Sequence, residues 1–151
     1  MAKNGFSMSN RVAVQTVSTA AATLTADDCG KIVILNRAAG TSVSLPSSPA
    51  VAGEGWNVTF IVTAAVTSNV YQIAATDGDY FQGGVSIIGT TVGTSDTFTA
   101  GATDDAINMN GTTTGGLEGT RITIYSDGST WHVNGVLCGS GATLATPFAT
   151  S

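Results

Sequence analysis

Residues 119–135 constrain the fold most, because this one stretch contains both strands and the turn of a hairpin. Two isoleucines alternate with more polar residues before an Asp127-Gly128 turn signal, and a tryptophan and a valine alternate with polar residues after it. Side chains that alternate with a period of two lie on opposite faces of a strand, and an Asp-Gly turn between such runs favours antiparallel pairing. We therefore place four residues in the core or in a subunit interface: Ile122, Ile124, Trp131 and Val133.

The rest of the chain repeats this pattern of short extended runs separated by turn residues. Further strands are expected at 31–36, 41–45, 56–62, 69–74, 85–88, 97–99 and 106–109. The run at 31–36 is continuously apolar at its centre, which predicts a strand buried on both faces. Two prolines and two glycines in residues 46–55 predict a long loop, and no stretch has the periodicity of an amphipathic helix.

Many short strands, spaced by roughly 8 to 12 residues, predict an all-β fold. We expect a single-domain antiparallel β-sandwich, jelly-roll-like in topology and without significant helix, because 151 residues suit one domain. The expected boundaries are a flexible N-terminal arm at 1–10, a sandwich at 11–138 and a C-terminal tail at 139–151.

Charged residues make up only 10% of the chain, against about 25% in an average soluble domain. A net charge of −5 with scattered basic residues argues against a nucleic-acid partner. No apolar run approaches the roughly 20 residues of a spanning helix, which argues against a membrane role, and the N-terminus lacks the apolar core of a secretory signal. We expect synthesis in a cytoplasm. Because so few charges protect the surface poorly against association, the composition favours a permanent assembly.

Few residues could carry catalysis, and we expect neither an enzyme nor a bound cofactor. His132 is the sole histidine, and its position on a strand favours a surface or interface imidazole over a general base or a zinc ligand. Asp77 and Asp79 are the one weak candidate for calcium, although Asp-Gly-Asp is favoured as turn chemistry. A carboxylate pair for glycoside cleavage is the alternative, and it requires a sizeable sugar cleft.

The cysteines and tryptophans each have two possible roles. Cys29 and Cys138 are the only cysteines, and a cytoplasmic protein favours free thiols over a disulfide between them. Trp56 and Trp131 are favoured as core anchors, with stacking against a sugar as the alternative.

The sequence resembles a family of small virion proteins of tailed bacteriophages, especially those of cyanobacterial and other marine phages. The similarity extends over residues 22–139, and its motifs are an Asp-Asp-Cys-Gly turn, a Leu-Pro strand end, a Phe-Ile-Val strand and a closing Ser-Asp-Gly-x-x-Trp hairpin. The stretches that carry these motifs are 23–31, 39–46, 55–62 and 124–135.

For the capsid decoration proteins among these relatives, the resemblance implies a homotrimer on the exterior of the phage head, made in the host cytoplasm. Such a trimer sits at threefold or quasi-threefold positions and locks neighbouring subunits of the major capsid protein. If the four apolar residues of the predicted hairpin at 119–135 form a subunit interface, that interface would then lie between the three copies of the trimer. The alternative is a trimeric tail-fibre, spike or head-fibre domain that binds host-surface glycans, and the lack of a long repetitive stalk in this sequence favours decoration.

Residues 1–11 have the irregular composition of an attachment segment, with two apolar anchors among polar residues. We expect capsid binding from Lys3, Phe6, Met8 and Arg11. A segment that orders on binding loses entropy, so that its affinity per contact is modest. Three such segments on one trimer would recover affinity through effective concentration.

Overall fold

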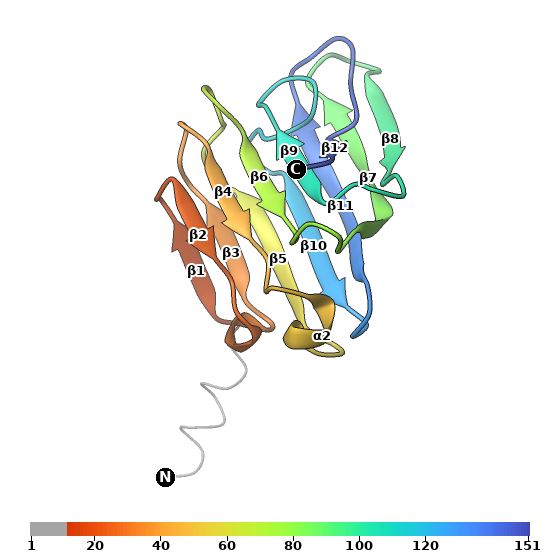
Figure 1. Cartoon of the computed structure of the whole chain (residues 1–151). Helices are drawn as coiled ribbons and strands as arrows, with labels where there is room; N and C mark the ends of the chain where they lie inside the picture. Colours follow the sequence, from red (N-terminus) through yellow and green to blue (C-terminus); the bar gives the residue numbers. More distant parts are fainter. Residues whose placement is uncertain (1–11) are drawn as a thin grey trace.

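The first six strands alternate between two sheets as the chain advances (Figure 1). The computed structural model describes residues 12–151. The strands that enter a seven-stranded sheet are β1 (Val14–Val17), β3 (Ile32–Leu35) and β5 (Asn57–Val62). The strands that enter a five-stranded sheet are β2 (Ala21–Thr23), β4 (Thr41–Ser44) and β6 (Tyr71–Ala74). Each return to a sheet places the new strand parallel to the previous one, so the first half of the chain is a coil of parallel strands.

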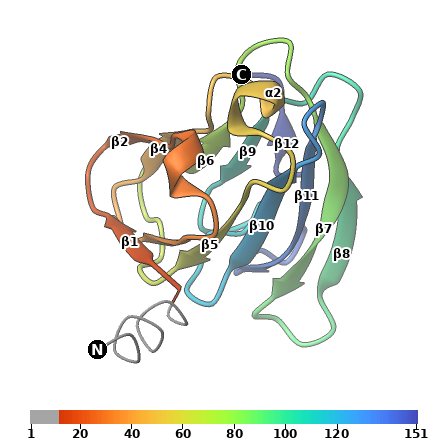
Figure 2. The same cartoon turned by 90° about the horizontal axis from the view of Figure 1, so that it is seen from below.

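The second half of the chain completes both sheets. Its strands are β7 (Phe81–Gly89), β8 (Ser95–Thr99), β9 (Ala106–Met109), β10 (Arg121–Ser126), β11 (Trp131–Gly139) and β12 (Phe148–Ala149). The larger sheet has the order β1-β3-β5-β10-β11-β7-β8, and the smaller has the order β12-β9-β6-β4-β2. Seen from one end, the two sheets form two facing layers (Figure 2).

This architecture confirms the predicted all-β sandwich and corrects the predicted strand pairing. Five of the ten strand pairings in residues 12–151 are parallel, so the sheets are mixed and not antiparallel. A jelly roll is built from antiparallel neighbours, and the coil of β1 to β6 does not follow that topology. The physical reason is that alternation specifies a strand and its buried face, whereas the path of the connection decides the direction of its neighbour.

The hairpin predicted at 119–135 is present as β10 and β11, paired in antiparallel register with Ile124 opposite Val133. It lies in the middle of the larger sheet, where β10 pairs with β5 and β11 pairs with β7. Ile122, Ile124 and Trp131 have no exposed surface and Val133 is 3% exposed. These four residues therefore belong to the core of the single chain, and nothing of them is left for contact with another subunit.

Aromatic side chains from neighbouring strands meet in this core. Trp56 precedes β5 and is 2% exposed, and its ring meets Trp131 edge to face with the centroids 5.4 Å apart. The Trp56 indole nitrogen donates a hydrogen bond to the Thr25 carbonyl oxygen at 3.1 Å. Both tryptophans are core anchors, and their burial removes them as platforms for a sugar.

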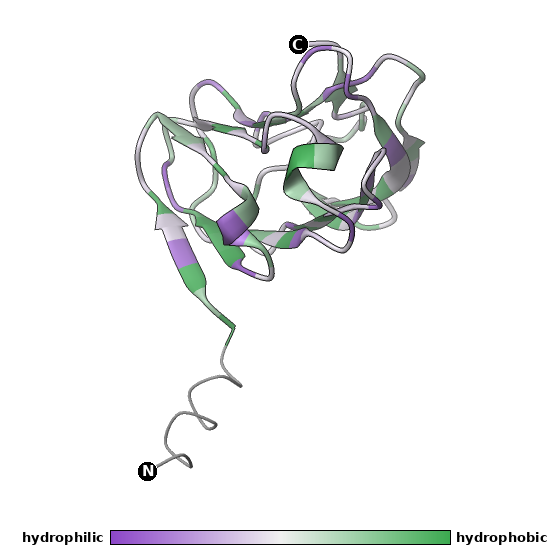
Figure 3. Ribbon diagram, turned by 60° about the horizontal axis from the view of Figure 1, so that its bottom comes forward, coloured by the Kyte–Doolittle hydropathy of each residue, from purple (hydrophilic) through white to green (hydrophobic). Residues whose placement is uncertain are grey.

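Two short helical segments lie at the same end of the sandwich (Figure 1). A four-residue helix, α2 (Pro49–Ala52), occupies part of the loop expected at 46–55, with a proline in its first turn and Ser48 as its N-cap. Figure 3 shows α2 as a green, apolar segment at the end of the space between the layers. A three-residue 3₁₀ helix, η1 (Ala26–Asp28), is closed by a capping box from Thr25. Burial raises the pKa of Asp28, but bonds from Lys31 and Thr25 outweigh it and lower the pKa overall.

Of the two boundaries predicted at the ends of the chain, the N-terminal one lies outside the described residues and the C-terminal one is wrong. The expected arm at 1–10, together with Arg11, lies outside the described residues. The expected tail at 139–151 is part of the sandwich, because β11 includes Gly139 and β12 pairs with β9. Phe148 explains this correction: its side chain is 5% exposed and belongs to the core, and one buried aromatic is enough to dock a segment that otherwise has the composition of a tail.

Candidate interaction surface

The outward-facing side chains of the seven-stranded sheet form a surface that we call the outer face. The strand register aligns them in rows that cross the sheet. One row contains Thr16, Ile34, Ile61, Arg121, Val136, Ser86 and Thr97. The next contains Val14, Ile32, Thr59, Thr123, Asn134, Gly84 and Thr99. A third contains Asn57, Tyr125, His132 and Gln82.

The outer face exposes apolar side chains on strands where an ordinary surface would carry polar ones. Exposed fractions are 58% for Val14, 51% for Ile88, 44% for Val136 and 41% for Tyr125. Arg121 carries the one formal charge in the three rows described above. Scattered exposed apolar residues are normal on a protein, but their gathering on one face with so little charge is typical of an interaction surface.

The strand at 31–36 was expected to be buried on both faces, and this expectation is wrong. Val33 and Leu35 are fully buried, whereas Ile32 and Ile34 lie on the outer face and are only partly buried. The continuous apolar run arises because the core and the outer face both carry apolar residues here. Exposed Ile and Val out of phase with the core positions are the sequence signal that could have revealed this surface.

The opposite surface of the sandwich has a different character. Outward positions of the five-stranded sheet carry only small or uncharged polar residues, which are Ala21, Thr23, Ser42, Ser44, Gln72, Ala74, Asn108 and Ala149. Ser42 donates a hydrogen bond to the Gln72 side-chain oxygen at 2.9 Å, so this face satisfies part of its own polarity. The apolar character is therefore specific to the outer face of the larger sheet.

Polar groups at the centre of the outer face are paired with each other. The hydroxyl oxygens of Thr59 and Thr123, on adjacent strands β5 and β10, are 3.1 Å apart and hydrogen-bonded. Hydroxyls that already have a partner cost less to remove from water than unpaired ones. The centre of this face is thus suited to burial against another protein surface.

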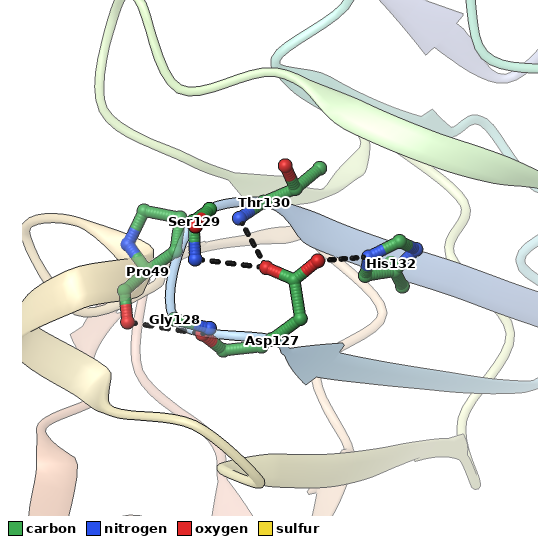
Figure 4. A network of polar contacts seen from close by, with 7 residues as sticks. Pro49, Asp127, Gly128, Ser129, Thr130 and His132 are labelled. Atoms are coloured by element: carbon green, nitrogen blue, oxygen red, sulfur yellow. Dashed lines mark hydrogen bonds and ion pairs between the residues drawn. The ribbon is translucent and has the colours of Figure 1, made fainter.

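One end of the outer face is fixed by a carboxylate in the β10–β11 turn (Figure 4). One Asp127 oxygen accepts hydrogen bonds from the backbone N–H groups of Ser129 and Thr130, at 2.8 and 2.7 Å. The other accepts from the His132 imidazole at 2.9 Å, and that ring stacks on Tyr125 with the centroids 4.8 Å apart. The hydrogen bond from His132, followed by the two backbone bonds, lowers the pKa of Asp127 to about 2. His132 is therefore a half-buried residue of β11 whose side chain ties that strand to the β10–β11 turn.

The same turn is tied to α2 by a buried serine. Ser126 is 1% exposed, and its hydroxyl donates to the Pro49 carbonyl oxygen at 2.9 Å and accepts from the Gly128 N–H at 3.0 Å. The sequence indicated the turn from Asp-Gly, but it gave no sign of the contact with α2, which lies 77 residues away in the chain.

The weak calcium candidate is a turn in the structure. Asp77 is exposed, and the Asp79 N–H donates to the Thr76 carbonyl oxygen at 2.9 Å. Within residues 12–151, no three His, Cys, Asp or Glu side chains gather as they would around a metal ion. The structure therefore does not bring further ligands to Asp77 and Asp79.

The remaining predicted residues fall in different places. Cys29 is exposed, Cys138 is half-buried, and both are free thiols. The residues expected to bind capsid, Lys3, Phe6, Met8 and Arg11, lie outside the described residues.

The part of the chain that the structure describes contains no helix long and apolar enough to span a bilayer. No protein-family model, curated protein or solved structure matches the chain.

Proposed function

We propose that this protein is a structural virion component, a decoration protein that binds the exterior of a phage head as a homotrimer and stabilises contacts between major capsid subunits. The observation that carries the proposal is the apolar, nearly uncharged outer face of the seven-stranded sheet. We assign this face to the contact between copies of the chain, and the predicted segment at 1–11 to the capsid.

The composition of the outer face suits a permanent contact. Burial of apolar surface stabilises an interface by about 25 cal/mol per Å², and a standard interface covers about 800 Å² on each partner. A charge that loses water without a partner opposes association strongly, and the three rows contain Arg121 as their one charge. A face built on paired strands is also ordered before binding, which lowers the entropy cost of association.

The first experiment is the mass of the purified protein in solution, by light scattering during gel filtration. We expect about three times the 15.1 kDa of one chain. The informative variant is Val136→Lys, because Val136 lies opposite Arg121 on the neighbouring strand and a second cation there has no counter-charge. Ser44→Lys, on the exposed side of the five-stranded sheet, is the matched control. We expect Val136→Lys to be a folded monomer and the control to stay trimeric.

Capsid binding is tested next, by mixing the protein with expanded, undecorated heads and sedimenting them. Saturable binding by the trimer, lost on deletion of residues 1–11, would support decoration. A monomeric wild type would refute the assignment of the outer face. A trimer that does not bind phage heads but binds host cells would instead support the fibre or spike alternative. The parallel coil of β1 to β6 also favours that alternative, since stacked parallel turns are the unit of elongated solenoids.

A further inference from the structure

A groove lies beside the end of the outer face, where three separate segments of the chain converge. The turn before β7 and the first residues of β7 contribute 78–83, the last residue of β8 and the loop after it contribute 99–102, and the β10–β11 turn contributes Ser129 and Thr130. Its volume is about 620 Å³, within the range of roughly 300 to 1,000 Å³ that small-molecule sites occupy. No residue of this groove was singled out for binding by the sequence, except Asp79 as a calcium candidate.

Hydrogen bonds fix all three walls of the groove before any ligand arrives. The Phe81 N–H donates to the Asp104 carbonyl oxygen at 2.9 Å, and the Ala100 N–H donates to the Gly83 carbonyl oxygen at 3.0 Å. The Gly101 N–H donates to the Asp104 carboxylate at 2.7 Å. Asp127 holds the third wall through the backbone bonds described above. A ligand here would meet a preformed surface and would not have to order a loop.

The side chains that line the groove define the chemistry of its ligand. Hydroxyl, amide and carboxylate groups come from Asp79, Gln82, Thr99, Ser129 and Thr130, and Tyr80, a residue that is 38% exposed, adds an aromatic ring. The described lining includes neither lysine nor arginine, so that it offers no cation to a phosphate or sulfate. Its many polar groups also make it a poor site for a lipid chain.

We propose that this groove binds a neutral saccharide. A sugar ring has hydroxyls that both donate and accept, which matches hydroxyl, amide and carboxylate partners, and an apolar C–H face that packs on an aromatic ring. Tyr80 supplies that ring, while Gln82 and the hydroxyls on the opposite wall orient the sugar. The glycines at 78, 83 and 101 leave the backbone accessible along the wall. This inference goes beyond the decoration role. Because Gln82 and Thr99 also belong to the rows of the outer face, it requires that the contact between copies leaves this end of the face uncovered.

The test is binding of the wild-type protein to an array of neutral oligosaccharides of glucose, galactose, mannose and N-acetylglucosamine, with sulfated and sialylated oligosaccharides on the same array. We expect binding to neutral members only. Tyr80→Ala should weaken the affinity about tenfold, as loss of an aromatic stacking partner does, and Tyr80→Phe should retain most of it. Val92→Ala is the control, because Val92 is fully exposed, lies outside the three rows of the outer face and does not line the groove.

Three outcomes would overturn the proposal. They are no binding to any neutral oligosaccharide, preference for the acidic ones, and binding that Tyr80→Ala leaves unchanged. The mass of each variant in solution separates this inference from the proposed function, since Tyr80 lies outside the three rows of the outer face and its replacement should leave the assembly intact.

Discussion

Trp56 and Trp131 provide a test of hydrogen bonding within one core cluster. The two rings pack edge to face and both are essentially buried, so replacement of either by phenylalanine removes a similar apolar group. Their indole nitrogens differ. Trp56 donates to the Thr25 carbonyl oxygen, whereas the buried Trp131 nitrogen has no partner among the described residues.

The two substitutions should therefore differ in cost. Trp56→Phe loses a hydrogen bond worth about 1 kcal/mol net, and the Thr25 carbonyl still accepts from the Asp28 N–H. Trp131→Phe removes an unpaired buried N–H, whose burial costs about 1 to 3 kcal/mol. Because the apolar loss is common to both, we expect Trp56→Phe to be more destabilising by about 2 kcal/mol. The larger truncation Trp131→Ala should cost about 3 to 5 kcal/mol.

Equilibrium unfolding in urea, followed by the fluorescence of the remaining tryptophan and by circular dichroism, measures this difference. With a slope of about 1 to 3 kcal/mol per molar urea, a difference of 2 kcal/mol separates the midpoints by about 1 M. Equal midpoints, or a more stable Trp56→Phe, would refute the reasoning and would mean that the Trp131 nitrogen is hydrogen-bonded in solution. Unchanged stability in Trp131→Ala would refute its place in the core.

Three further predictions concern the backbone and the polar network. Gly83 has a φ of 116°, and an added Cβ would lie 2.1 Å from the Val133 carbonyl oxygen, so Gly83→Ala should cost about 3 kcal/mol of stability. Gly93→Ala is the comparison, because Gly93 has open space around it, and it should cost about 1 to 2 kcal/mol. Comparable urea midpoints for the two variants would contradict this prediction. Ser126→Ala should cost about 1 to 2 kcal/mol in the same assay, because it removes the buried hydrogen bond to the Pro49 carbonyl, which still accepts from the Gly53 N–H, and leaves the half-buried Gly128 N–H without its partner. Since the pKa of Asp127 falls from 3.8 to about 2 on folding, its contribution is present above pH 4 and is lost as the pH falls through 2. The difference in melting temperature between wild type and Asp127→Asn should therefore be larger at pH 5 than at pH 2, and a difference independent of pH would count against the network.

The sequence predicts strands and buried faces better than it predicts their neighbours. The hairpin of β10 and β11 was predictable because both of its strands and the turn between them lie within the 19 residues 121–139, and Asp127 and His132 are hydrogen-bonded across the same turn. The parallel coil was not, because the alternation in β4 is the same whether the adjacent strand runs parallel or antiparallel. What decides the direction is the path of the chain between the sheets, which leaves no periodic signal.

The surfaces were predictable only in part. The low charge of the chain indicated an assembly, but Ile32 and Ile34 were read as core residues because an apolar run does not distinguish the core from an interface. Tyr80 directly precedes β7 and Gln82 is its second residue, in a stretch of ordinary composition, and their meeting with Ser129 depends on the position of β11 beside β7. A groove formed by three distant segments has no local motif.

The position of the β10–β11 hairpin also determines the order in which the protein can fold during synthesis. Without residues 121–139, the larger sheet consists of two separate pieces, β1-β3-β5 and β7-β8. One edge of β5 and one edge of β7 are then unpaired. A ribosome therefore delivers 139 of the 151 residues before the sheet can close, and the exposed strand edges are open to pairing with another chain during that interval. Insertion of the hairpin is a late, long-range step, and it predicts slow folding for a protein of this size.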